Sequence, residues 1–165
     1  MRETLAEAVV KLLKEKKMTV TTVESCTGGL MSATLVDVSG ASEVFYQGVV
    51  TYANEAKVRL VGVNENTLAA FGAVSEETAR EMAEGGAKTA NADVCLSVTG
   101  IAGPGGGTKE KPVGLVYIGC YFNGTTAVEK NIFSGNRREV REQSVEAAFK
   151  LLLKCLQMER QEDLT

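Results

Sequence analysis

The sequence predicts an α/β fold, namely a single-domain mixed β-sheet with helices on both faces that ends in a β-hairpin followed by a long helix. Three observations support this prediction. Segments rich in β-branched residues alternate with segments of helical apolar spacing over the first hundred residues. An Asn123-Gly124 pair, which is typical of a type I′ turn, separates two later strand-like segments. The C-terminal segment returns to helical spacing.

The N-terminal third of the chain contains two helix-like and two strand-like segments. Apolar residues recur at helical spacing from Leu5 to Leu13, and Ser39-Gly40 interrupts a second helical segment. In chain order, we expect a helix over residues 3–16, a strand over 18–23, a helix over 30–38 and a strand over 46–53.

The middle of the chain contains three helical segments with polar starts. Asn54 is the expected N-cap of a short helix through Leu60, and Ser75 the N-cap of a longer helix to Thr89. A short helix is expected between them, over residues 67–71.

The remaining predicted elements are a strand over residues 93–98, a loop over 99–112, strands over 113–122 and 125–133, and a helix over 137–158.

The composition is that of one ordinary globular domain, and several classes of protein are disfavoured. The chain of 165 residues is expected to form one domain, 1–165, with a frayed polar tail over 159–165. The net charge of −3 without a basic cluster argues against nucleic-acid binding. No apolar run is long enough to cross a bilayer, and the four cysteines show no metal-binding spacing. We therefore expect a cytoplasmic protein with no membrane contact and no metal.

The sequence contains no histidine. A Ser-His-Asp triad, a Cys-His pair and a histidine-built metal site are therefore excluded. Any hydrolytic chemistry must take its base from lysine, tyrosine, aspartate, glutamate or a bound ion.

The segment from Glu24 to Gly29, with the sequence ESCTGG, joins a predicted strand to a predicted helix. Ligands bind at such strand ends in α/β proteins, and glycines let backbone N–H groups approach a ligand closely. Ser25 can serve here as a nucleophile, with backbone N–H groups around Thr27 to Gly29 as an oxyanion hole. Alternatively, Ser25 or Thr27 only caps the following helix.

Tyr52 and Lys57 are candidate partners for this nucleophile. They lie at the end of a predicted strand and in the first turns of a predicted helix, so both can project toward one sheet edge. A desolvated lysine can act as a base toward serine, and a tyrosine can relay a proton. The alternative is an exposed lysine beside a tyrosine at the rim of the core. Cys26 is a rival nucleophile that we rank below Ser25.

Two further features can hold an anion. The loop from Thr99 to Gly107 is rich in glycine and can present backbone N–H groups, although it matches neither the P-loop nor the dinucleotide-binding pattern. Arg137 and Arg138 open the last predicted helix, where a cation is unfavourable unless it meets a negative group.

Several motifs together resemble the CinA C-terminal domain family, in the same order over about residues 3–158. These motifs are ESCTGG at 24–29, VTYANEAK at 50–57, GAVSE at 72–76, TGIAGPGG at 99–106 and KPVG at 111–114. The resemblance implies a nicotinamide-nucleotide amidase, which converts nicotinamide mononucleotide to nicotinate mononucleotide and ammonia without a cofactor. A non-catalytic nucleotide-binding or regulatory protein is the alternative that uses the same pocket.

The resemblance also implies roles for particular residues. Ser25 is the implied nucleophile, Lys57 its base and Tyr52 an assisting group. The implied partner is a small nucleotide, and we expect a homo-oligomer. The residues expected to bind substrate are Glu24, Thr27, Gly28, Gly29, Thr99, Gly100, Gly103, Gly105 and Arg137.

Overall fold

The computed structural model describes residues 2–162 of the chain, with side chains through Met158. One five-stranded sheet forms its centre, in the order β2-β1-β3-β4-β5. The first three strands in this order are parallel, whereas β4 and β5 pair antiparallel. The strands are β1 (Val20–Glu24), β2 (Phe45–Val50), β3 (Val94–Gly100), β4 (Leu115–Phe122) and β5 (Thr125–Ile132).

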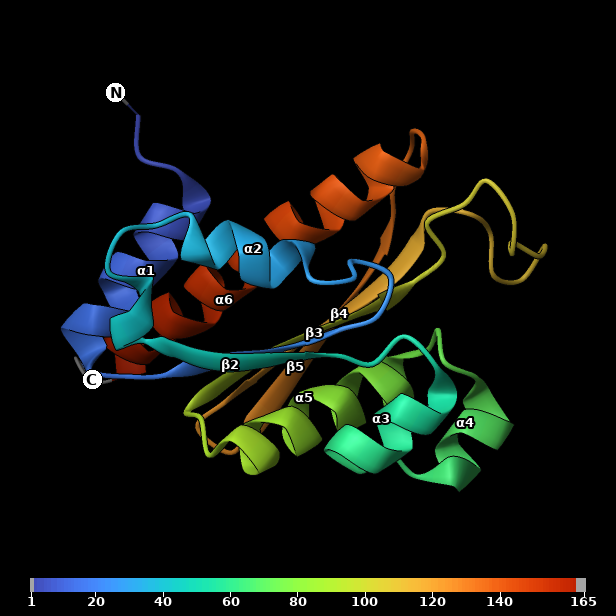
Figure 1. The fold of residues 1–165 in the computed structure, drawn as a ribbon, viewed down its shortest axis with the longest axis horizontal. Helices are drawn as coiled ribbons and strands as arrows, with labels where there is room; N and C mark the ends of the chain where they lie inside the picture. Colours follow the sequence, from blue (N-terminus) through green and yellow to red (C-terminus); the bar gives the residue numbers. More distant parts are fainter. Residues whose placement is uncertain (1, 163–165) are drawn as a thin grey trace.

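Helices cover both faces of the sheet, which confirms the predicted fold class (Figure 1). In Figure 1, α1, α2 and α6 lie above the sheet and α3, α4 and α5 lie below it. The helices are α1 (Leu5–Lys16), α2 (Leu30–Val36), α3 (Asn54–Val61), α4 (Glu65–Phe71), α5 (Glu76–Ala90) and α6 (Arg137–Glu162), with a short 3₁₀ turn at Ala41–Glu43.

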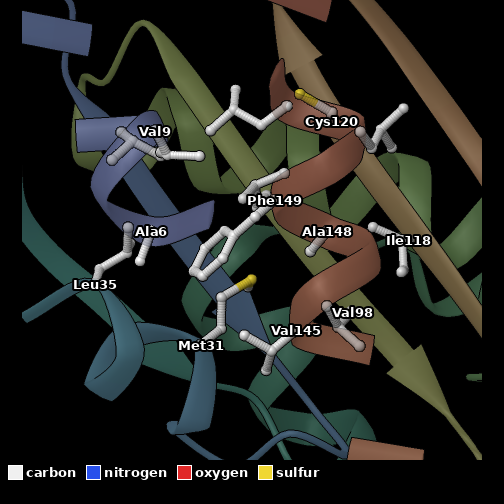
Figure 2. Packing of buried hydrophobic residues seen from close by; sticks show 14 of the residues in the cluster. Ala6, Val9, Met31, Leu35, Val98, Ile118, Cys120, Val145, Ala148 and Phe149 are labelled. Carbon is white, nitrogen blue, oxygen red and sulfur yellow. The ribbon is translucent and has the colours of Figure 1, made fainter. Parts of the chain in front are cut away.

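The larger hydrophobic cluster lies between the sheet and α1, α2 and α6. Phe149 of α6 is buried at its centre, beside Met31 of α2 and Val9 of α1 (Figure 2). A smaller cluster on the opposite face includes Val23 of β1 and Met82 of α5. Because α6 packs along the larger cluster, its N-terminal turn is held at a fixed place relative to the sheet.

The carboxyl ends of β1, β2 and β3 meet at one edge of the sheet, because these strands are parallel. The chain leaves β1 into the turn at Ser25, leaves β2 toward α3, and leaves β3 into the glycine-rich loop. The topology therefore brings together three segments that the sequence singled out.

Helix starts differ from the sequence predictions in three places. Helix α1 begins at Leu5, two residues after the predicted start, because Thr4 is its N-cap. Asn54 was the predicted N-cap of α3, but it is the first helical residue, and Ala53 occupies the N-cap without a side-chain hydrogen bond. The extended backbone therefore ends one residue earlier than predicted. Asn64 caps α4 through a hydrogen bond from the Asn66 N–H, which starts that helix two residues before the predicted position. Ser75 caps α5 as predicted.

The C-terminal part follows the predicted hairpin and helix. Asn123 and Gly124 both have positive φ, at 50° and 78°, as a type I′ turn requires. Helix α6 continues through Glu162, so the backbone at 159–162 is helical where the sequence predicted fraying, and 163–165 lie outside the described residues. Across residues 2–162, no helix combines the length and the low charge that a bilayer crossing requires.

The N-terminus of α2 is capped by a side chain from the preceding strand. Both carboxylate oxygens of Glu24 accept hydrogen bonds, from the Met31 N–H at 2.8 Å and from the N–H and hydroxyl of Ser32 at 3.0 and 2.7 Å. The residue at the N-cap itself is Gly29, which has no side chain to cap with. Glu24 therefore satisfies donors at the start of α2 and fixes the turn between β1 and α2.

We predict that Glu24→Gln lowers the free energy of unfolding by about 2–3 kcal/mol, because an amide replaces a fully buried carboxylate that accepts three hydrogen bonds. Urea unfolding measures the difference. Glu110→Gln, at an exposed loop position, is the control and should change stability by less than about 0.5 kcal/mol. Equal stability of the two variants would contradict this role of Glu24.

Candidate active site

A cavity of about 280 Å³ opens at the sheet edge where β1, β2 and β3 end. Five separate segments of the chain line it. Ser25 and Cys26 come from the turn after β1, and Tyr52 and Lys57 from the end of β2 and from α3. The linker before α5, the loop after β3 and Arg137 at the start of α6 complete the wall. The structure thus brings together the predicted nucleophile and both of its predicted partners.

Lys57 is the central buried group of this cavity. Its side chain is only 1% exposed, although lysine is rarely buried in proteins. The Nζ atom donates to Ser25 Oγ at 2.9 Å and to the backbone carbonyl of Thr51 at 2.7 Å. The interpretation of Lys57 as an exposed surface lysine is therefore wrong.

Burial changes the protonation of this amine. Desolvation lowers the pKa of Lys57 from 10.5 to about 8, and the nearby Cys26 opposes this shift. The two hydrogen-bond partners of Nζ are neutral, so neither compensates the lost hydration of a positive charge. About a tenth of the amine is neutral at pH 7, whereas an ordinary lysine is neutral in about one molecule of three thousand.

Cys26 also lines the cavity, but its thiol is a poor nucleophile here. Burial raises the pKa of Cys26 from 9.0 to about 11, despite the nearby cations Arg141, Lys57 and Arg137. Only about one thiol in ten thousand is then ionised at pH 7. Ser25, by contrast, has a hydrogen bond to a basic amine.

Tyr52 and Arg137 form the outer wall of the cavity. The Tyr52 side chain is 64% exposed, and its hydroxyl accepts a hydrogen bond from Arg137 Nη2 at 3.2 Å. Arg137 also donates from Nη1 to the carbonyl of Gly103 at 2.8 Å. Tyr52 is thereby linked to the glycine-rich loop through Arg137.

Four predicted substrate-binding residues lie elsewhere. Glu24, Thr27, Gly28 and Gly29 do not line the cavity. Glu24 caps α2, and the Gly28 N–H donates to the Ser25 carbonyl within the turn, so it is not available as an oxyanion donor. Neither Ser25 nor Thr27 caps α2, because the N-cap is Gly29. The glycines shape the turn, at φ values of 57° and 102°, rather than contacting the cavity.

Sequence reasoning missed Arg141. It lies one helical turn after Arg137 on α6, and its guanidinium donates to the carbonyls of Cys26 and Thr27 at 3.0 and 2.8 Å. Arg141 therefore ties the nucleophile-bearing turn to α6. The four-residue spacing of the two arginines was the signal that places both on one helix face.

The loop after β3 is tightly packed where it starts and has open space around Gly105. A Cβ atom at Gly100 would come within 2.8 Å of the Leu115 carbonyl, so this position leaves no room for a side chain. Thr99 is held by a hydrogen bond from its hydroxyl to the Ala73 carbonyl at 2.8 Å. Gly105 has open space around it, and Gly103 and Gly106 have φ values of 82° and 87°. Thr99, Gly100, Gly103 and Gly105 all line the cavity, as predicted.

The arrangement places a serine hydroxyl, an amine of lowered pKa and a cationic side chain within one small cavity. Among the side chains described, those of residues 2–158, no group of three or more cysteine, aspartate or glutamate residues is placed to hold a metal ion. The geometry fits acyl transfer through serine with a lysine base.

Comparison with known proteins identifies the family. Residues 2–156 match the model of the CinA C-terminal domain. A CinA-like protein of Kosmotoga olearia is 53% identical over 154 residues, which are 93% of this chain and 37% of that protein. A relative from Clostridioides difficile, named as a competence-damage inducible protein, is 58% identical over 83% of this chain and 33% of its own length. The chain thus spans about a third of the curated relatives that it matches.

Solved structures agree with this match over nearly the whole fold. The competence/damage inducible protein CihA from Agrobacterium tumefaciens superimposes with a TM-score of 0.90 at 41% identity, covering 93% of each chain. A competence or damage-inducible protein from Enterobacter asburiae gives a TM-score of 0.89 at 35% identity, covering 94% of this chain and 99% of that one. The chain belongs to the CinA C-terminal domain family.

Proposed function

We propose that this protein hydrolyses the carboxamide of nicotinamide mononucleotide to nicotinate mononucleotide and ammonia. The observation that carries the proposal is the hydrogen bond of 2.9 Å between Lys57 Nζ and Ser25 Oγ, at an amine that is almost fully buried. Membership of the CinA family supports the substrate class, since the sequence motifs resemble those of its nicotinamide-nucleotide amidases.

In the proposed reaction, neutral Lys57 takes the hydroxyl proton of Ser25 as Oγ attacks the carboxamide carbon. The resulting ammonium lies beside the tetrahedral intermediate and stabilises its negative charge. Lys57 then returns the proton to the leaving amine, and ammonia departs from the acyl-enzyme. A water molecule, deprotonated by the same amine, attacks the ester and releases the carboxylate and Ser25.

The outer wall of the cavity is the proposed site for the nucleotide. Arg137 lies at the N-terminus of α6, where the helix dipole adds to its positive charge and favours a phosphate. The exposed ring of Tyr52 is suited to pack against the pyridine ring, with its hydroxyl oriented by Arg137. The backbone of the Gly103–Gly106 segment can supply further N–H donors, except at Pro104.

We expect Ser25→Ala to lose at least about 10³-fold in ammonia release from nicotinamide mononucleotide, because the acyl-enzyme cannot form. Cys26→Ala, at the adjacent cavity-lining residue, is the matched control and should keep most of the activity. Full activity of the Ser25 variant would disprove the serine mechanism. Calorimetric binding of the nucleotide by the wild type without turnover would instead support the non-catalytic alternative.

The pH dependence of kcat/KM should report the buried amine. The base must be neutral, so kcat/KM should rise about tenfold per pH unit below pH 8 and level off above the pKa of about 8. Lys57→Arg should abolish turnover, because a guanidinium stays protonated. Lys150→Arg, at an exposed position on α6, is the control and should keep the wild-type profile. A wild-type profile that is flat from pH 6 to 9 would exclude Lys57 as the base.

Arg137→Ala should raise KM for nicotinamide mononucleotide by about 10-fold or more, because a charge-assisted hydrogen bond to phosphate is lost. The same variant should act on nicotinamide riboside, which lacks the phosphate, much as the wild type does. Arg138→Ala removes a neighbouring arginine that pairs with Glu142, and it should leave KM near the wild-type value. An equal loss for both substrates would argue against phosphate recognition by Arg137.

A further inference from the structure

Two of the four cysteines face each other at the end of the molecule opposite the active-site cavity. Cys120 lies in β4 near its end at Phe122, and Cys155 lies on α6. The two residues line one cavity of about 250 Å³, together with Phe122 and Met158. Figure 2 shows the Cys120 side chain beside the α6 ribbon. Along α6, Cys155 lies about 27 Å from Arg137, so this cavity is separate from that of Ser25.

The two thiols form an asymmetric pair. The interaction between the two thiols raises the pKa of Cys120 and lowers the pKa of Cys155 from its ordinary value. Cys120 is only 1% exposed, and burial raises its pKa further. Cys155 is half-buried, and the nearby Lys154 favours its ionised form while Glu129 opposes it. Cys155 is therefore the more accessible and more readily ionised sulfur of the two.

The other two cysteines lack these properties. Cys95 is fully buried and its pKa is raised by burial, and Cys26 behaves likewise in the active-site cavity. Reaction with a peroxide requires a thiolate that the peroxide can reach. Of the four positions, Cys155 meets this requirement best, and the second thiol, Cys120, lines the same cavity.

We propose that Cys120 and Cys155 are a redox modification site, at which a peroxide converts the two thiols to an intrachain disulfide between β4 and α6. The Cys155 thiolate attacks one peroxide oxygen, and the O–O bond breaks to give a sulfenic acid and a hydroxide ion. The Cys120 sulfur then attacks the sulfenic sulfur of Cys155 and displaces the sulfenic oxygen as hydroxide. With the protons of both thiols, the two oxygens leave as two water molecules, so two thiols are oxidised and one peroxide is reduced.

The bond would close a loop of 34 intervening residues, which contains β5 and most of α6. Such a cross-link reduces the freedom of the unfolded chain and stabilises the fold. Because the site is remote from Ser25, its principal effect is on stability. We expect the oxidised protein to melt about 5–10 °C above the reduced protein.

Treatment of the reduced protein with hydrogen peroxide, followed by non-reducing tryptic mapping, tests the proposal directly. Trypsin yields peptide 110–130, which contains Cys120, and peptide 155–160, which contains Cys155. We expect these two peptides to be recovered joined, and to separate on reduction. The joined pair should form in Cys95→Ala as in the wild type, and should be absent from Cys155→Ser. In Cys120→Ala, a dimedone adduct should accumulate on Cys155, because the resolving thiol is missing.

A second measurement, the melting temperature, tests the proposal even if Cys120→Ala, which changes a buried side chain, folds poorly. The wild type should show the rise in Tm on oxidation, and Cys155→Ser, which changes a half-buried side chain, should show none. Recovery of Cys155 only as an unlinked sulfinic or sulfonic acid would overturn the proposal. An equal Tm shift in Cys155→Ser, or a cross-link formed through Cys26 or Cys95 instead, would also overturn it.

Discussion

The buried amine of Lys57 is the constraint on which the rest of the site depends. An ammonium ion in this position loses nearly all of its hydration, and its two partners, the Ser25 hydroxyl and the Thr51 carbonyl, carry no charge to replace it. The fraction of neutral amine at pH 7 is therefore much larger than for an ordinary lysine, which suits a base. The same two contacts require the end of β2, the start of α3 and the turn after β1 to meet within a few ångströms. The parallel pairing of β1 with β2 brings these segments to one edge.

The position of Glu24 protects this arrangement. A carboxylate beside Lys57 would favour the ammonium form and raise its pKa, which would weaken the base. Glu24 adjoins Ser25 in the chain and is fully buried. Its carboxylate, however, accepts its hydrogen bonds from the N–H groups and the hydroxyl at the start of α2. Helices α2 and α3 lie on opposite faces of the sheet (Figure 1). The buried acid is therefore hydrogen-bonded to groups of α2, whereas the buried base is hydrogen-bonded to Ser25 and Thr51.

The sequence predicts the architecture well, because periodicity and turn chemistry are local properties. The hairpin at Asn123-Gly124 and the Ser75 cap are examples, since each depends on residues that are adjacent in the chain. Residue type, position at element ends and family motifs also singled out Ser25, Lys57 and Arg137 as candidates, and all three line the cavity. The roles of Glu24 and Arg141 were not, because their partners lie across a turn or 114 to 115 residues away. Hydrogen bonds of this kind depend on how the helices pack against the sheet, which no local pattern in the sequence reveals.

Helix α6 connects the two ends of the molecule through its packing. Its first turns carry Arg137 and Arg141, which hold the glycine-rich loop and the nucleophile turn. Its middle is fixed in the larger core by buried side chains such as Phe149 and Leu152. Cys155 follows only after this buried stretch, so a covalent change there acts on a helix whose position is already set by close packing. A cross-link at that end can therefore restrict unfolding of α6 and the hairpin while the contacts of Arg137 and Arg141 stay in place.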